Sequence, residues 1–579
     1  MKQTLKYYKP YLFFILLILA FLFGQAMCEL ALPGYMSDII NNGIVQQDMD
    51  YIKSTGLVMI LVSAGSLVCA IGGSFLAAIV AGKSSCDVRS ALFKKVTRFS
   101  TAELDTFSTA SLITRSTNDI QMVQQATVMI LRLACFAPMM GIGAVIKALN
   151  TSVSLSWTVG LALLVILCIM GMAFVLVLPK FQVLQKKLDR LNLLMKERLN
   201  GVLVIRAFTT EKNEEERFDV ANRDLTKINL FVNKAMSFMM PALMFVMNAV
   251  SILIIWAGAH LVEAQNLLIG DMLAYLQYAM HVIMSFLYIT MMFIMIPRAA
   301  VSAQRIGKVL EVEPSIVDKE NPQKPENPKG IVSFSNVSFA YPDADEKTLA
   351  DISFTAEPGK TTAIIGGTGS GKSTLISLIP RFYDATEGQI TLDGIDIRDM
   401  TQHDLHQQIG YIPQKGLLFS GTIGSNLQYG KEDATEEEML EAARIAQAME
   451  FIEEKEHGLE EEVAQGGTNV SGGQKQRLSI ARALVKKPKI YIFDDSFSAL
   501  DFNTDKALRA ALKEKVGDST IIIVAQRINT IVDADQILVL DEGRLVGKGT
   551  HEELLESCHV YKEIALSQLS EEELERGRN

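Results

Sequence analysis

The sequence has few charged residues and no strong excess of one sign. Of its 579 residues 21% are charged and 49% are hydrophobic, whereas an average soluble chain carries about 25% charged residues. The mean hydropathy is +0.23. The net charge of −10 combines both signs, so we expect no nucleic-acid partner. This composition argues against a wholly soluble protein and against a disordered chain.

Cysteine is also scarce, and its positions lack the spacing of a metal site. The six cysteines are Cys28, Cys69, Cys86, Cys135, Cys168 and Cys558. Four of them lie in apolar runs, where cysteine behaves as a small hydrophobic residue. A disulfide scaffold is therefore not expected. A single hydrophobic core is excluded as well, because at about 150 residues per domain the chain has the length of roughly four domains.

In place of charges the sequence has long apolar runs, and a membrane-spanning helix needs about 20 such residues. Asp, Glu, Lys and Arg are absent from 10–28, 54–82, 148–179, 235–262 and 272–297, and only Arg132 interrupts 120–146. We predict six spans, at about 10–32, 54–82, 120–147, 148–179, 235–262 and 270–297. The first is not expected to be a cleaved signal, because five more follow it. Arg132 either lines a cavity or lies near the end of its span.

The charges between the spans predict the orientation. The loops 83–119 and 180–234 and the stretch after the last span are rich in Lys and Arg, whereas the loops 29–53 and 263–271 are acidic. By the positive-inside rule, both termini lie in the cytoplasm of a multi-pass protein of the cell membrane. Apolar residues in 180–234 recur at helical spacing, so we expect the spans to continue as helices into the cytoplasm. Plain connecting loops are the alternative.

The segment 311–330 holds four prolines and many charges, which is typical of an extended linker. The pattern of apolar residues changes after this segment. Beyond it, strand-like and helical runs alternate, which predicts a mostly parallel sheet covered by helices. The strand-like runs are 331–339, 361–366, 389–392, 489–493, 519–525 and 535–540, and the helical runs are 437–452, 472–486 and 504–516. We therefore predict a transmembrane domain over 1–310, a linker over 311–330 and an α/β domain over 331–579.

The strand-like run 361–366 leads into a glycine-rich turn that fits the phosphate-binding pattern G-x-x-x-x-G-K-[ST]. Its residues are Gly366, Gly367, Thr368, Gly369, Ser370, Gly371, Lys372 and Ser373, followed by Thr374. Backbone amides of such a turn bind a phosphate chain, the lysine reaches the outer phosphates, and the Ser373 hydroxyl is placed to ligate Mg²⁺. The run 490–495 predicts a buried strand that ends in Asp494, the expected second-sphere or direct carboxylate for Mg²⁺. We expect ATP and Mg²⁺ as cofactors.

Three further features extend this site. Ser471, Gly472, Gly473 and Gln474 open a helix, where hydroxyl and amide groups form an anion site for a second nucleotide. Since one chain already has its own phosphate loop, that nucleotide belongs to another chain. Gln414 is placed to contact Mg²⁺ or the attacking water. Tyr341 either stacks on adenine or is a half-buried aromatic residue at the edge of a sheet.

With these motifs in order, the whole chain resembles a half-transporter of the ATP-binding cassette (ABC) exporters. The motifs correspond to the Walker A, Q-loop, signature, Walker B and D-loop, the last at 498–501. The resemblance implies an all-α six-helix transmembrane domain with long cytoplasmic helical extensions, followed by an α/β P-loop ATPase domain. It also implies an ATPase and translocase that pairs with a second subunit. By analogy, coupling helices that dock on nucleotide-binding domains lie near 101–110 and 209–215.

The sequence departs from the family at the catalytic positions. Asp495 stands where hydrolytic members have glutamate, and its carboxylate is one methylene shorter; positioning errors near 1 Å cost about 10²-fold in rate. Gln526 stands where the family has the switch histidine, and an amide cannot become positively charged. Val470 replaces leucine in the signature, and Gln465 and Gly466 replace the usual Glu and Arg before it.

Together these departures resemble the degenerate-site subunit of heterodimeric bacterial multidrug exporters. The implied chain binds ATP, hydrolyses it poorly, and completes the partner's hydrolytic site with its signature while moving amphipathic small molecules out of the cell. Methionine and phenylalanine crowd the last two spans and line either a substrate site or the membrane lipids: Met236, Met239, Met240, Met244, Met247, Met280, Met284, Met291, Met292 and Met295, with Phe238, Phe245, Phe286 and Phe293. The alternatives are a lipid or peptide exporter subunit and a nucleotide-gated regulatory subunit.

Overall fold

The computed structural model describes residues 2–342 and 344–568. This description does not include the side chains at positions 2, 3, 173, 174, 178, 181, 182, 185, 236, 240, 293 and 294. Three of these, Met236, Met240 and Phe293, belong to the two methionine-rich spans. The chain divides into two compact units. The first contains Met1–Val96 and Thr109–Val312, and the second contains Thr97–Ser108 and the chain from Glu313 onward.

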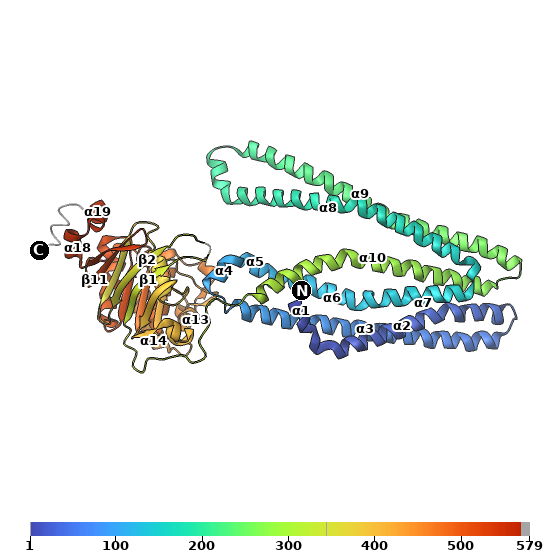
Figure 1. The fold of residues 1–579 in the computed structure, drawn as a ribbon, viewed down its shortest axis with the longest axis horizontal. Coiled ribbons are helices and arrows are strands. Elements are labelled where there is room, and N and C mark those ends of the chain that lie inside the picture. Colours follow the sequence, from blue (N-terminus) through green and yellow to red (C-terminus); the bar gives the residue numbers. More distant parts are fainter. Residues whose placement is uncertain (1, 343, 569–579) are drawn as a thin grey trace. The chain divides into compact units, whose positions relative to one another are not determined.

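The first unit is helical (Figure 1). Its main helices are α2 (Leu12–Asp38), α3 (Met49–Val96), α6 (Ile120–Met129), α7 (Cys135–Thr151), α8 (Ser156–Ala207), α9 (Glu211–Glu263) and α10 (Ile269–Glu311). Shorter segments are α1 (Lys2–Leu5), η1 (Lys6–Tyr11), η2 (Ile39–Ile44), α5 (Thr109–Thr114), η3 (Arg115–Asp119), η4 (Ile130–Ala134) and η5 (Val153–Leu155). In the described part of the chain, six continuous helical stretches are long and apolar enough to cross a membrane. The protein is therefore a multi-pass membrane protein.

Three details refine the predicted helices. The basic loops are helical as predicted, because α3 runs to Val96 and α8 and α9 are separated only by a turn at 208–210. The chain turns between the third and fourth spans at 152–155, several residues beyond the predicted boundary at 147/148. The third span includes the π-helical segment η4, where the side chain of Arg132 is exposed.

The second unit contains a six-stranded sheet in the order β12-β11-β3-β10-β9-β6. Its strands are β3 (Thr361–Gly366), β6 (Ile409–Ile412), β9 (Ile490–Asp494), β10 (Thr520–Val524), β11 (Gln536–Asp541) and β12 (Arg544–Gly549). All neighbours are parallel except β11 and β12. An antiparallel sheet has the order β2-β1-β4-β5, from β1 (Val332–Phe339), β2 (Leu349–Ala356), β4 (Glu387–Leu392) and β5 (Ile395–Asp396), and β7 (Gly421–Thr422) pairs with β8 (Glu462–Val463).

The helices of this unit are α4 (Thr101–Phe107), α11 (Lys372–Leu378), α12 (Gln402–Gln407), α13 (Ile423–Gln428), α14 (Glu436–Ile445), α15 (Met449–Glu453), α16 (Gly472–Val485), α17 (Phe502–Lys515), α18 (His551–Ser557) and α19 (His559–Gln568). The alternation predicted an α/β domain, and this is confirmed. The predicted strands 331–339 and 389–392 correspond to β1 and β4 and lie in the antiparallel sheet, not in the mostly parallel one. The single helix predicted over 437–452 is two helices, because Gln447 adopts a left-handed backbone (φ +57°) between α14 and α15.

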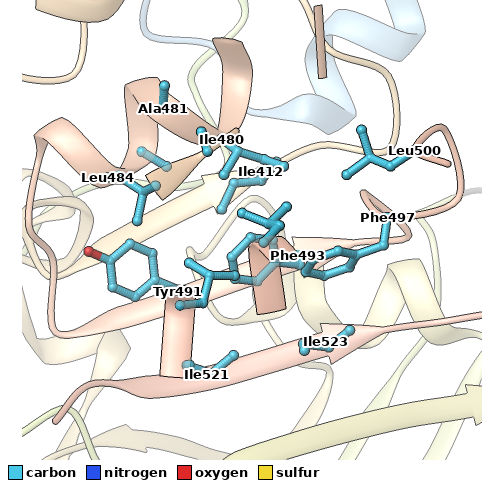
Figure 2. Packing of buried hydrophobic residues seen from close by; sticks show 14 of the residues in the cluster. Ile412, Ile480, Ala481, Leu484, Tyr491, Phe493, Phe497, Leu500, Ile521 and Ile523 are labelled. Carbon is cyan, nitrogen blue, oxygen red and sulfur yellow. The ribbon is translucent and has the colours of Figure 1, made fainter. Parts of the chain in front are cut away.

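The parallel strands are buried on both faces. Successive residues of β9 alternate between two cores, with Tyr491 and Phe493 on one side and Ile490 and Ile492 on the other. Figure 2 shows the first core, where Phe493 packs between the α16 side chains and the neighbouring strand β10. This two-sided burial explains why IYIF is a continuous apolar run rather than an alternating one.

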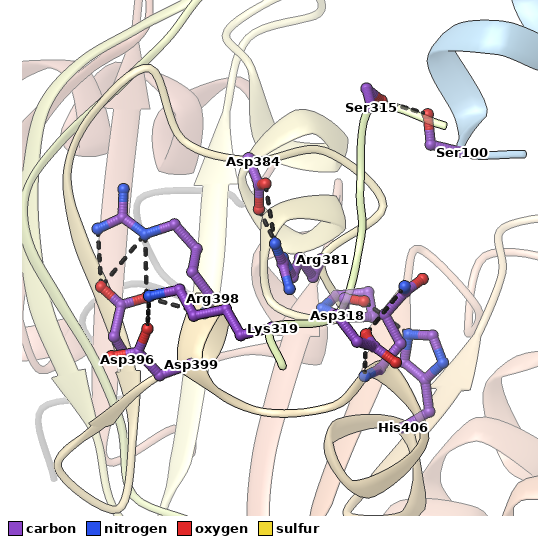
Figure 3. Close-up of polar contacts among 12 residues, drawn as sticks. Ser100, Ser315, Asp318, Lys319, Arg381, Asp384, Asp396, Arg398, Asp399 and His406 are labelled. Atoms are coloured by element: carbon purple, nitrogen blue, oxygen red, sulfur yellow. Dashed lines mark hydrogen bonds and ion pairs between the residues drawn. The ribbon is translucent and has the colours of Figure 1, made fainter. Parts of the chain in front are cut away.

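The second unit has no helix or strand from Glu313 to Ile331. Side chains hold this segment to the rest of the unit, because Lys319 pairs with Asp399 and Asp318 accepts a hydrogen bond from the backbone of Gln402 at 2.9 Å (Figure 3). The same figure shows Ser315 beside Ser100, whose hydroxyl groups are 2.9 Å apart.

Helix α4 belongs to the second unit although its sequence lies between two spans. Its buried residue Glu103 accepts hydrogen bonds from the backbone of Ser100 (2.7 Å) and of Ser315 (3.1 Å). The Ser100 hydroxyl also donates to Glu103, at 2.6 Å. Burial opposes ionisation, but the hydrogen bonds from the side chains and the backbone of Ser100 and Ser315 prevail and lower the pKa of Glu103. Helix α4 coincides with the first predicted coupling helix. The second, near 209–215, is not a separate helix but a turn followed by the start of α9.

The packing of β9 gives a stability test. Phe493 is fully buried, whereas Phe502 at the start of α17 is 64% exposed. We expect Phe493→Ala to lower the free energy of unfolding by about 3–5 kcal/mol because it leaves a cavity, and Phe502→Ala to change it by less than about 0.5 kcal/mol. Thermal unfolding of both full-length variants in detergent measures this, and equal effects would contradict the packing described.

Candidate nucleotide site

The site lies at the carboxyl edge of the parallel sheet, where four neighbouring strands end together. Register aligns Val524 of β10 with Asp494 of β9 on one side and with Ile364 of β3 on the other. Ile412 of β6 lies beside Phe493 of β9. Ligands of open α/β sheets bind outside such an edge. The loops that follow these strands carry the predicted Walker A, Walker B, switch and Q-loop residues.

The phosphate loop connects β3 to α11 and requires glycine at specific points. Gly369 and Gly371 have positive φ angles of +84° and +94°, which side chains rarely tolerate. A Cβ atom on Gly366 would clash with the carbonyl oxygen of Leu540 on the neighbouring strand. The Lys372 ammonium group donates to the carbonyl oxygens of Gly366 (2.8 Å) and Gly367 (2.7 Å). Burial lowers the pKa of Lys372, and the two nearby carboxylates oppose this.

Asp494 lies at the end of β9 and is 7% exposed. Its carboxylate accepts hydrogen bonds from the Ser373 hydroxyl (3.0 Å) and from the Tyr411 hydroxyl (3.3 Å). Burial raises the pKa of Asp494 despite these two donors. The predicted Mg²⁺ ligands Ser373 and Asp494 are therefore adjacent, and both present oxygen atoms.

Asp495 follows β9 with a left-handed backbone (φ +48°), which aspartate adopts more readily than most residues. One of its carboxylate oxygens, Oδ2, accepts hydrogen bonds from the side-chain amides of Gln526 (2.7 Å) and Gln414 (3.1 Å). The three predicted catalytic residues thus meet at a single oxygen atom. The Gln414 amide nitrogen donates in this hydrogen bond, which leaves the amide oxygen, the atom of this side chain that can ligate a metal ion, without a role in it.

Tyr341 lies beside the first turn of α11, with its hydroxyl 3.0 Å from the Thr374 hydroxyl. Its ring makes edge-to-face contacts with Phe339 (centroids 5.0 Å apart) and Tyr383 (5.4 Å). The Tyr383 hydroxyl in turn donates to Asp105 on α4 at 3.1 Å. Tyr341 is therefore next to the phosphate loop, in an aromatic group that also contacts α4.

The signature residues form the N-terminus of α16. The Ser471 hydroxyl accepts a hydrogen bond from the backbone of Gln474 (3.3 Å), and the Gln474 side chain accepts one from the backbone of Ser471 (3.0 Å), which is a capping box. The Gln474 side chain is thus occupied locally. Gly472 is exposed, and no atom lies within 4 Å of where its Cβ would be. Among the described residues, no hydrogen bond joins the signature to the group around Lys372 and Asp495.

Sequence reasoning missed residues that act on the site from outside the motifs. Tyr411 lies three positions before Gln414, but its contact with Asp494 spans 83 residues of sequence. Tyr383 contacts both the Tyr341 ring and α4. Gln568, in the last helix, contacts the backbone around Gln526. A hydroxyl or an amide in a helical or apolar run gives no signal of such a long-range contact.

Comparison with known proteins agrees with this geometry. The family model of the ABC transporter transmembrane region matches residues 14–286, and that of the ABC transporter matches residues 349–498. The chain is 40% identical over 568 residues to an uncharacterised ABC transporter ATP-binding protein of Mycobacterium tuberculosis, covering 97% of each chain. It is 30% identical over 551 residues to the ATP-dependent lipid A-core flippase of Pasteurella multocida, covering 93% of each.

Among solved structures, a bacterial Atm1-family ABC exporter with ATP bound has the same fold, with a TM-score of 0.77 and 24% sequence identity over 96% of this chain and 98% of that one. The phosphate loop and Walker B strand lie within the matched ATP-binding region, and the candidate spans largely coincide with the matched transmembrane region. The chain therefore belongs to the ABC transporter family, as an ATP-binding half-transporter with the fold of an ABC exporter.

Proposed function

We propose that this chain is the degenerate-site subunit of a heterodimeric exporter that moves amphipathic small molecules out across the membrane. The observation that carries this proposal is the environment of Asp495. Its Oδ2 atom already accepts two amide hydrogen bonds, from Gln526 and Gln414. A carboxylate held in this way, on a side chain shorter than glutamate, is poorly placed to activate a water molecule.

ATP binding depends on different residues from hydrolysis. Lys372, the phosphate-loop amides and Tyr341 are arranged for binding, and the Ser373 and Asp494 oxygens are the kind of ligand that Mg²⁺ prefers. When bound, Mg²⁺ would neutralise phosphate charge beside the buried Asp494 carboxylate. Gln526 can donate a hydrogen bond to a γ-phosphate but cannot carry a positive charge. The site therefore suits retention of ATP more than its hydrolysis.

The signature supports the assignment of a partner. Ser471, Gly472 and Gly473 are exposed or half-buried at the start of α16, where amides and the helix dipole favour an anion. In this proposal they complete the ATP site of a second half-transporter with an intact catalytic glutamate. In this proposal both termini and the ATP-binding unit lie in the cytoplasm, which the basic loops support through the positive-inside rule.

The transported molecule is proposed from the apolar surface of the last two spans. Phe238, Met244, Phe245 and Met291 are exposed in the isolated chain, and such side chains form adaptable apolar walls. A lipid is the second candidate, because the similar lipid A-core flippase shares 30% identity with this chain over 93% of its length. Transport assays with the reconstituted heterodimer distinguish the two candidates, using a fluorescent amphipathic cation and a fluorescent lipid as parallel substrates.

The first test concerns the chain without a partner. We expect it to bind ATP–Mg²⁺ but to hydrolyse it far below the rate of about 1 s⁻¹ or more that is common for enzymes. The double variant Asp495→Glu/Gln526→His, which restores the family's residues, should raise hydrolysis by at least about tenfold, within the roughly 10²-fold attributed to positioning. Phosphate release by the purified chain measures both. Fast turnover by the unaltered chain would refute the degenerate site.

The second test uses Lys372. Lys372→Ala should weaken nucleotide binding at this chain's own site while reducing, but not abolishing, ATP hydrolysis by the heterodimer, since the hydrolytic phosphate loop belongs to the partner. The matching lysine substitution in the partner is the control and should abolish turnover. Complete loss of turnover from Lys372→Ala in correctly assembled dimers would reverse the assignment of the two sites.

The third test uses the signature. Gly472→Glu has open space in this chain, so the fold should be retained, but a bulky negative side chain would repel the partner's ATP. Loss of preorganised donors of this kind costs about 10²–10³-fold in rate, so ATPase and transport by the heterodimer should fall on that scale. Nucleotide binding at this chain's own Walker A serves as the control. Unchanged turnover would contradict the heterodimer.

A further inference from the structure

One side chain of helix α19 (His559–Gln568) forms hydrogen bonds with the backbone at and after the switch residue Gln526. After β10 ends at Val524, the chain passes through Gln526 to the short helix η9 (Ile528–Thr530). The Gln568 amide nitrogen donates to the carbonyl oxygen of Gln526 at 2.8 Å. The Gln568 amide oxygen accepts from the backbone N–H of Ile528, also at 2.8 Å. The Gln568 amide thus forms hydrogen bonds with one backbone carbonyl group and one backbone N–H group, as the backbone of a neighbouring strand would.

Helix α19, which carries Gln568, is itself anchored in the main core. Tyr561 and Ala565 on α19 are fully buried in the same hydrophobic cluster as Ile528. The Tyr561 hydroxyl is 2.7 Å from the Nδ1 atom of His551 on α18. The amide of Gln568 therefore reaches the switch segment from a fixed helix, although the Gln568 side chain is exposed.

We propose that Gln568 is a positioning residue for Gln526, and that through it the C-terminal helix sets how well this chain's site distinguishes a nucleoside triphosphate from a diphosphate. The link is short. Gln568 fixes the carbonyl oxygen of Gln526, and the side chain of Gln526 reaches Asp495 at 2.7 Å. In the proposed function, the Gln526 amide donates a hydrogen bond to the γ-phosphate. Among the described residues, the hydrogen bonds of the Gln568 side chain go to the backbone of Gln526 and Ile528, so its effect is expected at the γ-phosphate and not at adenine.

This inference rests on the proposed role of the site in retaining ATP. A positioning role for Gln568 and a simple helix-capping role predict different effects of substituting this residue. A cap would change the stability of the fold and leave nucleotide affinities in their normal ratio. A positioning residue changes the affinity for a triphosphate and leaves the affinity for ADP unchanged, because ADP lacks the phosphate that Gln526 would contact.

The experiment measures equilibrium binding of two probes, the non-hydrolysable triphosphate AMPPNP with Mg²⁺ and ADP with Mg²⁺, to the full-length chain in detergent. Gln568→Leu keeps the approximate volume but removes both hydrogen bonds. We expect it to weaken AMPPNP binding by roughly three- to tenfold, the worth of about one hydrogen bond, with ADP binding unchanged. Gln568→Glu keeps only the acceptor and should give a smaller loss.

Two controls separate positioning from stability. Tyr561→Phe removes the contact between α19 and His551 without touching the switch segment, so it should lower the melting temperature while the ratio of AMPPNP to ADP affinity stays at its original value. In the Gln526→Ala background, Gln568→Leu should have no further effect on that ratio, since the residue through which it acts is gone. An unchanged ratio in Gln568→Leu, or an additive loss in the double variant, overturns the proposal.

A failure of the proposed function is recognised separately. Rapid ATP hydrolysis by the unaltered chain would contradict the degenerate site, yet AMPPNP is not hydrolysed, so the comparison with ADP would still decide the role of Gln568.

Discussion

The register of the parallel strands is the constraint on which the rest of the nucleotide site depends. Because Asp494, Val524 and Ile364 are aligned across β9, β10 and β3, the loops after these strands leave the sheet at one level. A shift of one residue in β9 would exchange the faces of its side chains and direct Phe493 to the position of Asp494. The apolar residues that fix the register in the two cores therefore also determine where the carboxylates lie.

Much of this arrangement could be predicted from local sequence. The run IYIFDD shows a strand buried on both faces that ends in carboxylates, and the structure confirms that β9 ends at Asp494. The glycines before Lys372 mark a turn that only a few residue types can form. The alternation of strands and helices was sufficient for the fold class, and the charge-free runs were sufficient for six candidate spans. Each strand, turn or charge-free run is recognised from its own consecutive residues, without knowledge of contacts to distant ones.

What could not be predicted depends on contacts between distant residues or on backbone geometry without a residue signal. Gln414 and Gln526 lie 81 and 31 positions from Asp495, so their convergence on a single oxygen atom is invisible in the sequence. Gln447 ends α14 with a left-handed backbone, and glutamine is not a turn residue, so one helix was predicted where two exist. The association of α4 with the ATP-binding unit depends on Glu103 accepting a hydrogen bond from Ser315, 212 positions away.

The charges at the site favour ATP binding independently of how well the site hydrolyses ATP. Burial disfavours the charged forms of both Lys372 and Asp494, as the lowered pKa of the first and the raised pKa of the second show. A phosphate chain with Mg²⁺ would supply an anion beside the lysine and a cation beside the carboxylate, so binding would stabilise both charged forms at once. The Asp495 carboxylate also favours the charged form of Lys372, and it is held by the amides of Gln526 and Gln414. A change that keeps the negative charge at position 495 can therefore alter the position of this carboxylate, and with it turnover, while its electrostatic contribution to binding is preserved.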